Sequence, residues 1–110
     1  MRKNLTIEQY EFGTIDGIDE EALLKAINKA QSRFFTKQEG FLYAEILKGD
    51  NKWIKVTYWN SPEEAKQAQK AFLDHSSCIP FIQMVSPSSI RTLYLERILR
   101  YKSQSFFERR

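Results

Sequence analysis

Hydrophobic and polar residues alternate with a period of two in four segments of the chain, and this alternation predicts four strands. The segments are 5–12, 41–48, 52–59 and 90–98. Two other segments place apolar residues at helical spacing. They contain Leu23, Ala26, Ile27, Ala30 and Phe34 in the first, and Ala65, Ala68, Ala71 and Phe72 in the second. The resulting order is βαββαβ, which is typical of a ferredoxin-like plait.

Local signals at the segment ends support this order. Asp19 offers an N-cap to the first helix, and Ser61 offers one to the second. Pro62 suits the first helical position, and Glu64 completes a Ser-x-x-Glu capping box. Turn residues at 49–51 predict a hairpin between the second and third strands, and residues 80–85 predict a short helix.

We therefore expect an α+β fold, with a four-stranded antiparallel sheet that carries both helices on one face. Alternation divides the strand residues between the two faces. We expect the aliphatic set to lie under the helices: Leu42, Ala44, Ile46, Ile54, Val56, Leu93 and Leu95. We expect the mixed set to lie on the open face: Phe41, Tyr43, Glu45, Trp53, Lys55, Thr57, Trp59, Tyr94 and Glu96.

The length of 110 residues predicts one domain, 1–110, with a core at 5–98 and a basic tail at 99–110. The formal net charge is +3. Residues 91–110 hold six Lys or Arg and two Asp or Glu, a local charge of +4, so the rest of the chain carries about −1. The simplest interpretation of the tail is a solvated terminus. Phe106 and Phe107 would be unusual in a solvated tail, so we expect them to pack against another apolar surface.

Cys78 is the single cysteine, so no intrachain disulfide can form, and one thiol with one histidine cannot build a cysteine-rich zinc site. We expect a buried, inert thiol. The first residues carry no continuous apolar run, and we see no signal peptide or membrane span. The expected location is cytoplasmic, with no membrane partner and no bound metal.

The strand end Tyr58-Trp59-Asn60-Ser61 runs into Glu64-Ala65, and residues 81–85 precede the last strand, 90–97. With the βαββαβ order, this pattern resembles the antibiotic-biosynthesis-monooxygenase-like proteins of the dimeric α/β-barrel superfamily. The resemblance covers about residues 5–98. It implies a homodimer in which two sheets pack face to face, and a cofactor-independent monooxygenase that acts on or binds a small aromatic molecule.

The resemblance does not imply a haem cofactor. Haem-degrading members have an Asn on the first strand, where this chain offers Tyr10, and a Trp within the second helix. The helix interior 65–71 contains no Trp here. We therefore expect no cofactor, since oxygen can react directly with an electron-rich phenolate.

The candidate general base is His75, because it is the one residue that titrates near neutral pH without help. In the segment 74–77 it could equally end a helix, where a cation suits the dipole. Candidate substrate-binding residues are aromatic or soft apolar side chains near the expected cavity. They are Trp59, Tyr58, Tyr10, Tyr43, Phe81 and Met84. Core or interface packing is the competing interpretation for each of them.

Three functions remain open at this stage. The first is an oxygenase with His75 as base and Trp59 as a wall of the pocket. The second is a dimer that binds a small apolar ligand without chemistry. The third, an RNA-binding module, is disfavoured because the third strand has no Gly-Phe step and Glu45 and Glu96 would repel phosphate. No nucleic-acid partner is therefore expected.

Overall fold

The computed structural model describes residues 5–104 and contains the predicted βαββαβ order. The strands are β1 (Thr6–Phe12), β2 (Phe41–Lys48), β3 (Trp53–Trp59) and β4 (Arg91–Glu96). The helices are α1 (Glu20–Arg33), α2 (Pro62–Phe72) and the short α3 (Ile79–Met84), with single 3-10 turns at Phe35–Lys37 and Pro87–Ser89. Phe106 and Phe107 lie outside the described residues.

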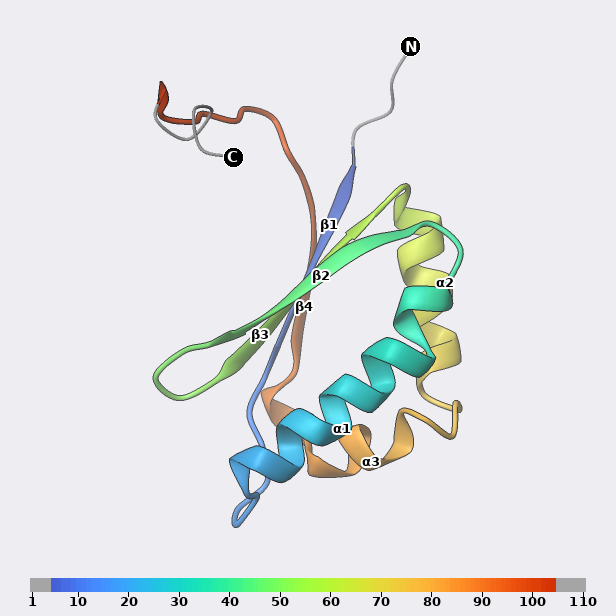
Figure 1. The fold of residues 1–110 in the computed structure, drawn as a ribbon, viewed down its shortest axis with the longest axis vertical. Coiled ribbons are helices and arrows are strands. Elements are labelled where there is room, and N and C mark those ends of the chain that lie inside the picture. The colour runs from blue at the N-terminus through green and yellow to red at the C-terminus, as the bar shows by residue number, and fades with distance from the viewer. Residues whose placement is uncertain (1–4, 105–110) are drawn as a thin grey trace.

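The four strands form one antiparallel sheet in the order β2-β3-β1-β4. The helices lie together on one face of this sheet, and the opposite face is left open (Figure 1). The predicted fold class, an α+β ferredoxin-like plait, is confirmed. None of the helices within residues 5–104 combines the length and apolar character needed to cross a bilayer.

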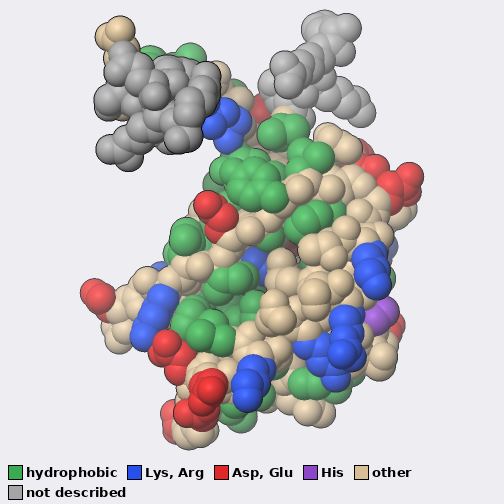
Figure 2. All heavy atoms as spheres, viewed as in Figure 1, with side chains coloured by type: hydrophobic (Ala, Val, Ile, Leu, Met, Phe, Trp, Pro, Cys, Tyr) green, Lys and Arg blue, Asp and Glu red, His purple; other side chains and the backbone are tan. Residues whose placement is uncertain are grey.

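The core lies between the helices and the sheet. Helix α1 contributes the predicted stripe, in which Leu23, Ala26, Ile27 and Ala30 are all buried. Helix α2 contributes Ala65, Ala68 and Phe72, whereas Ala71, expected on the same stripe, is exposed. In the space-filling view, apolar side chains gather where the sheet meets the helices, and charged side chains lie mostly around them (Figure 2).

The predicted assignment of the strand faces is wrong for most of the sheet. On β3 the residues that face the helices include Lys55, Thr57 and Trp59, which are buried, while Leu93 and Leu95 of β4 are more than two-fifths exposed. On β2 a bulge between Phe41 and Tyr43 changes the alternation. Phe41, Ala44 and Ile46 therefore share the helix side with the buried β3 residues to which they pair.

The entry into α2 shows the predicted capping chemistry. Ser61 Oγ accepts a hydrogen bond from the Glu64 backbone N–H at 3.2 Å, and it donates one to Glu64 Oε1 at 3.1 Å. Glu64 in turn lies against Gly40, whose φ of 85° is in the left-handed region. A Cβ at Gly40 would overlap the Glu64 carboxylate, so the turn before β2 and the start of α2 require glycine here.

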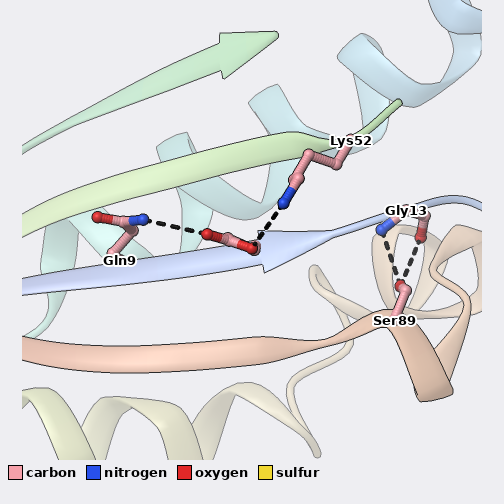
Figure 3. A network of polar contacts seen from close by, with 5 residues as sticks. Gln9, Gly13, Lys52 and Ser89 are labelled. Carbon is pink, nitrogen blue, oxygen red and sulfur yellow. Dashed lines mark hydrogen bonds and ion pairs between the residues drawn. The ribbon is translucent and has the colours of Figure 1, made fainter. Parts of the chain in front are cut away.

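The far end of β1 is fixed by polar contacts to the segment before β4 (Figure 3). Ser89 Oγ accepts a hydrogen bond from the Gly13 backbone N–H at 2.8 Å, and Ser86 N–H donates to the Gly13 carbonyl at 2.9 Å. On the open face nearby, Glu11 receives a hydrogen bond from Gln9 and an ion pair from Lys52, each at 3.2 Å. The Gly13 contacts thus tie the segment between α3 and β4 to the end of β1.

Replacing Gly40 by Ala should lower the free energy of unfolding by about 2–3 kcal/mol, because both the left-handed backbone and the Glu64 carboxylate disfavour a Cβ. Gly17→Ala is the matched control, because Gly17 has a φ of 81° but nothing within 4 Å of its Cβ position. It should cost only about 1–2 kcal/mol. Urea denaturation measures both, and equal costs would contradict the overlap with Glu64.

Candidate functional site

A carboxylate lies buried between the helices and the sheet. Glu8, at the centre of β1, is 1% exposed, and its Oε1 accepts a hydrogen bond of 2.9 Å from the indole Nε1 of Trp59. Antiparallel pairing places Glu8 directly between Thr57 on β3 and Tyr94 on β4, on the helix side of the sheet. The indole therefore fixes one carboxylate oxygen in a position where water has little access.

A buried lysine, Lys55 on β3, lies next to Glu8 on the helix side of the sheet, because it pairs with Tyr10, two residues after Glu8 on β1. Lys55 is 2% exposed, and its Nζ lies 3.3 Å from the centre of the Phe35 ring. The Tyr10 and Phe72 rings are also close, at 5.4 and 5.5 Å. Such contacts stabilise a desolvated cation by about 2 kcal/mol or more. The ammonium group is therefore held by aromatic faces next to the Glu8 carboxylate.

The two buried charges influence each other's titration. Burial raises the pKa of Glu8, and the positive charge of Lys55 and the hydrogen bond from Trp59 oppose that rise. Burial lowers the pKa of Lys55 to about 8, and the negative charge of Glu8 opposes that fall. Burial and the negative charge of Glu8 also raise the pKa of Tyr10 to about 12, so Tyr10 stays a neutral hydrogen-bonding group at physiological pH.

A hollow of about 300 Å³ lies beside Glu8, where β1, β4 and the start of α2 meet. Its lining includes Thr6, Tyr94 and Pro62, together with Leu5, Leu95 and Glu96. Thr6 precedes Glu8 by two residues on the same face of β1, and Tyr94 pairs with Glu8 across the strands. Burial and the negative charge of Glu8 raise the pKa of Tyr94, which is consistent with this proximity.

A second hollow, of about 250 Å³, lies between the β2–β3 turn and the start of α1. Its lining is largely polar and includes Glu20, Lys48 and Asp50. Lys48 and Glu20 form an exposed ion pair of 2.7 Å across it. None of the aromatic side chains predicted to bind a substrate lines this hollow, so it does not resemble the expected site.

Four of the predicted substrate-binding residues lie on the helix side of the sheet or in the layer that covers it. Trp59 and Tyr10 are both buried and contact Glu8 and Lys55 respectively. Phe81 is buried against Phe12, with ring centres 5.2 Å apart. Met84 is partly buried against the same core. Trp59 and Tyr10 thus belong with Glu8, Lys55 and Thr57 to one buried polar cluster. Phe81 and Met84 pack at the other end of β1.

Tyr58 and Tyr43 lie on the opposite, open face. Their rings stack 4.3 Å apart with an interplanar angle of 10°, and the Arg97 guanidinium lies 5.6 Å from the Tyr58 ring. The sheet itself separates this stack from Glu8 and Trp59. The two tyrosines and Trp59 therefore do not share one cavity in this subunit, although all three come from adjacent strand ends.

His75 lies beyond the end of α2, whereas the hollow beside Glu8 lies at the start of that helix. Its ring centre is 4.9 Å from that of Phe34, and its Nδ1 accepts a hydrogen bond from the Ser77 backbone N–H at 3.1 Å. The length of α2, 11 residues, separates the two places by roughly 16 Å at 1.5 Å per residue. The role of His75 as a base stays a prediction.

Sequence reasoning missed the roles of Glu8, Lys55 and Thr57. Lys55 and Thr57 were predicted on the open face because aliphatic residues are the usual lining of a core, and Glu8 was assigned to neither face. One signal was present. The set that includes Trp53, Lys55, Thr57 and Trp59 has the larger aromatic side chains, which are needed to fill the space below two helices.

Within residues 5–104 no group of three His, Cys, Asp or Glu side chains is arranged to hold a metal ion. Cys78 is buried, as expected, and burial raises the pKa of its thiol, so it is a poor nucleophile at neutral pH. The groups available for chemistry in the buried polar cluster are a carboxylate, an ammonium group, hydroxyls and aromatic rings.

Comparison with known proteins supports the fold. No protein-family model matches the chain, and no curated protein matches it in sequence. Solved structures do match. SnoaB, a cofactor-independent oxygenase from Streptomyces nogalater, is similar with a TM-score of 0.58 and 15% identity, over 93% of this chain and 99% of SnoaB.

Two further structures carry names that provisionally assign them as antibiotic biosynthesis monooxygenases. The one from Bordetella bronchiseptica has a TM-score of 0.75 and 9% identity, over 88% of this chain and all of that one. The one from Nitrosomonas europaea has a TM-score of 0.67 and 7% identity, over 89% and 94%. The predicted resemblance to antibiotic-biosynthesis-monooxygenase-like proteins is therefore confirmed at the level of the fold.

The buried Lys55 should leave a signature in the pH dependence of stability. Its pKa is about 8 in the folded chain and near 10.5 when unfolded, so between these values the unfolded state binds more protons and stability rises with pH. The free energy of unfolding should gain up to about 3 kcal/mol across this window, at about 1.4 kcal/mol per pH unit.

Lys55→Met should lose this rise, because methionine fills a similar space without a titrating group. Glu8, Tyr10 and Cys78 face the same region and also titrate or perturb it, so the measured quantity is the difference between the two proteins in urea denaturation from pH 8 to 10. A difference that does not change with pH would contradict the lowered pKa.

Proposed function

We propose that this chain binds a small aromatic molecule in the hollow beside Glu8 and oxidises it with molecular oxygen, without a cofactor. The observation that supports the proposal most directly is the Glu8 carboxylate, which is buried, held through one oxygen by Trp59 and adjacent to the hollow. A desolvated carboxylate with a raised pKa is suited to take a proton from a phenol.

The dimensions and lining of the hollow fit a small ring system. Its volume of about 300 Å³ is at the lower end of the range for ligand sites, roughly 300–1,000 Å³. The Tyr94 ring and Pro62 offer flat apolar surfaces, and Thr6 offers a polar atom. Glu8 lies behind this lining, two residues beyond Thr6 on the same face of β1. This combination of apolar walls with few polar groups is usual for sites that orient a small molecule.

The proposed reaction starts when Glu8 accepts the proton of a phenolic hydroxyl. The resulting phenolate is electron-rich and reduces oxygen directly. One oxygen atom bonds to the ring carbon opposite the hydroxyl, and that carbon loses its hydrogen as a proton. The second oxygen atom leaves as water, which takes this proton and the proton held by Glu8, so the carboxylate is restored. Phenol and O₂ thus become quinone and water, a four-electron exchange that needs no other reductant. Lys55 offsets the negative charge on the phenolate or on Glu8.

Replacing Glu8 by Gln should reduce oxygen consumption by about 10²-fold or more, because Gln keeps an acceptor for Trp59 but cannot take the proton. The assay uses 1-naphthol, a phenol with an open position opposite its hydroxyl, and follows oxygen uptake and quinone absorbance. Thermal denaturation of the same variant shows whether it is folded.

His75→Ala tests the alternative base in the same assay. Because His75 lies at the other end of α2 from the hollow, we expect oxygen consumption to stay within about twofold of the wild-type rate. Loss of turnover in His75→Ala with full activity in Glu8→Gln would assign the base to His75. Binding of 1-naphthol without oxygen uptake by the wild type would favour a non-catalytic ligand-binding protein.

We also propose that a second copy of the chain covers the open face of the sheet. Tyr43, Leu47, Leu93 and Leu95 on this face are each between 43% and 49% exposed, although they lie in ordered strands. Exposed apolar side chains gathered on one sheet face are the kind of patch that marks a protein–protein contact. Face-to-face packing of two such sheets would bury them and leave each hollow within its own subunit.

Leu93→Asp should convert a dimer of about twice 13.0 kDa into a monomer, because it places a charge within the patch that the second copy would bury. Leu73→Asp is the matched control, since Leu73 is 55% exposed but caps α2 away from the open face. Native mass spectrometry and light scattering read out the mass. A monomeric wild type, or dissociation by both variants, would count against the interface.

A further inference from the structure

The chain leaves the sheet as an exposed apolar segment, residues 97–102, which we call the arm. Pairing of β4 with β1 ends at Glu96, and the arm that follows belongs to no helix or strand. Ile98, Leu99 and Tyr101 are 75%, 70% and 85% exposed. Figure 1 shows the chain after β4 extending past the end of the sheet, away from the helices. Large apolar side chains exposed together mark a surface that contacts another molecule.

Strand β2 forms the other outer edge of the sheet, and this edge can accept a further strand. Within residues 5–104, β2 pairs only with β3. Edges are usually protected against pairing by proline, lysine or a bulge. β2 contains no proline, its one lysine is its last residue, and its bulge lies near its start, between Phe41 and Tyr43. Residues 44–47 therefore offer backbone N–H and C=O groups on their outer side.

The arm and the β2 edge are complementary in charge. The arm contains three basic residues and no acidic one. Residues 39–47, which include most of β2 and the turn before it, contain Glu39 and Glu45 and no basic residue. Opposite charges on neighbouring strands stabilise their pairing, and like charges oppose it. A strand formed by the arm is therefore favoured at this edge over pairing of two β2 edges with each other.

The arm also continues the apolar row of the open face. Alternation from Leu95 assigns Arg97, Leu99 and Tyr101 to the open side of the sheet. The position of Arg97 supports this assignment, because its guanidinium lies 5.6 Å from the ring of Tyr58, which is on the open face. The apolar patch that a second copy is proposed to cover thus extends beyond the end of β4 into the arm.

The arm is too short to pair with the β2 edge of its own copy. In the order β2-β3-β1-β4, a strand outside β2 would lie four strand spacings from β4, about 19 Å at roughly 4.8 Å per spacing. Six extended residues span only about 20 Å, so the arm would be used up in crossing the end of the sheet. A two-fold axis between two packed sheets can instead bring β2 of one copy beside β4 of the other.

We propose that the arm of each copy adds as a fifth strand to the β2 edge of the other copy. The inference rests on the second copy proposed above and gives it a role at the hollow. The arm directly follows Tyr94, Leu95 and Glu96, which form half of the lining of the hollow beside Glu8. Pairing of the arm with the partner fixes the end of β4, so this wall of the hollow is held in place only in the dimer.

Hydrogen exchange of the full-length chain, followed by mass spectrometry, tests whether the arm is paired. In the dimer, arm amides should exchange about 100-fold or more slowly than those of an unstructured peptide. In Leu93→Asp, which should be monomeric, they should exchange at the unstructured rate. Protection that persists in the monomeric variant would mean that the arm packs on its own copy, and would overturn the inference.

The same experiment separates this inference from the proposed sheet-to-sheet contact. A dimeric wild type with an unprotected arm would overturn the exchange of arms and leave the contact between the open faces standing. A monomeric wild type would contradict the second copy itself, and the exchange of arms with it.

Cross-linking of co-expressed copies identifies the surface that receives the arm. One copy carries Leu99→Cys and the other Leu47→Cys on β2, and a flexible bismaleimide joins thiols that lie close together. The native Cys78 is buried and is the same in both copies. Leu24→Cys on α1 replaces Leu47→Cys as the matched control, because Leu24 and Leu47 are 43% and 46% exposed. The product with β2 should exceed the control product about tenfold or more. Equal yields would overturn the assignment to β2.

Discussion

The arrangement of the interior depends on one pair of opposite charges, Glu8 and Lys55, placed between the helices and the sheet. Isolated charges are unstable in such surroundings, and each of these is compensated by a different means. Glu8 receives the indole N–H of Trp59, while Lys55 is enclosed by aromatic faces. The aromatic richness of the chain thus has a specific use, because rings both fill the space and stabilise the cation.

This constraint also explains why the sheet is built with its aliphatic residues outward. If Glu8 and Lys55 occupy the helix side, strict alternation assigns Ile54, Val56 and Leu93 to the open face. The interior polar cluster and the exposed apolar face are therefore two results of one alternation. A one-residue change of register would exchange the two faces, so the buried polar cluster and the exposed apolar face depend on each other.

The sequence predicted the order and approximate ends of all six principal elements, because caps, turns and periodicity are local. It predicted Ser61 and Asp19 as helix caps, and both accept the expected backbone hydrogen bond. The candidate site was harder. Trp59 and Tyr10 do lie in the buried cluster, but Glu8 was overlooked. A carboxylate on a strand is usually solvated, and only the contacts of β1 with β3 and the helices show that it is not.

Alternation alone cannot decide which face of a strand the helices cover, and the wrong choice placed Lys55, Thr57 and Trp59 on the open face. The bulge between Phe41 and Tyr43 added a second error, because it changes which β2 residues face the helices relative to strict alternation. The sequence also could not show which residues far apart in the chain lie close together in the fold. His75 follows the second helix closely in the sequence, yet the direction of that helix carries it away from the hollow.

The hydrogen bond between Trp59 and Glu8 has an optical consequence. The indole is fully buried and points its N–H at a carboxylate, whereas Trp53 is only partly buried and lies 5.7 Å from the Lys48 ammonium. The emission of an indole responds to nearby charge, so the fluorescence of Trp59 reports whether Glu8 is ionised. The protein carries an intrinsic reporter at the one position where a proton is proposed to move.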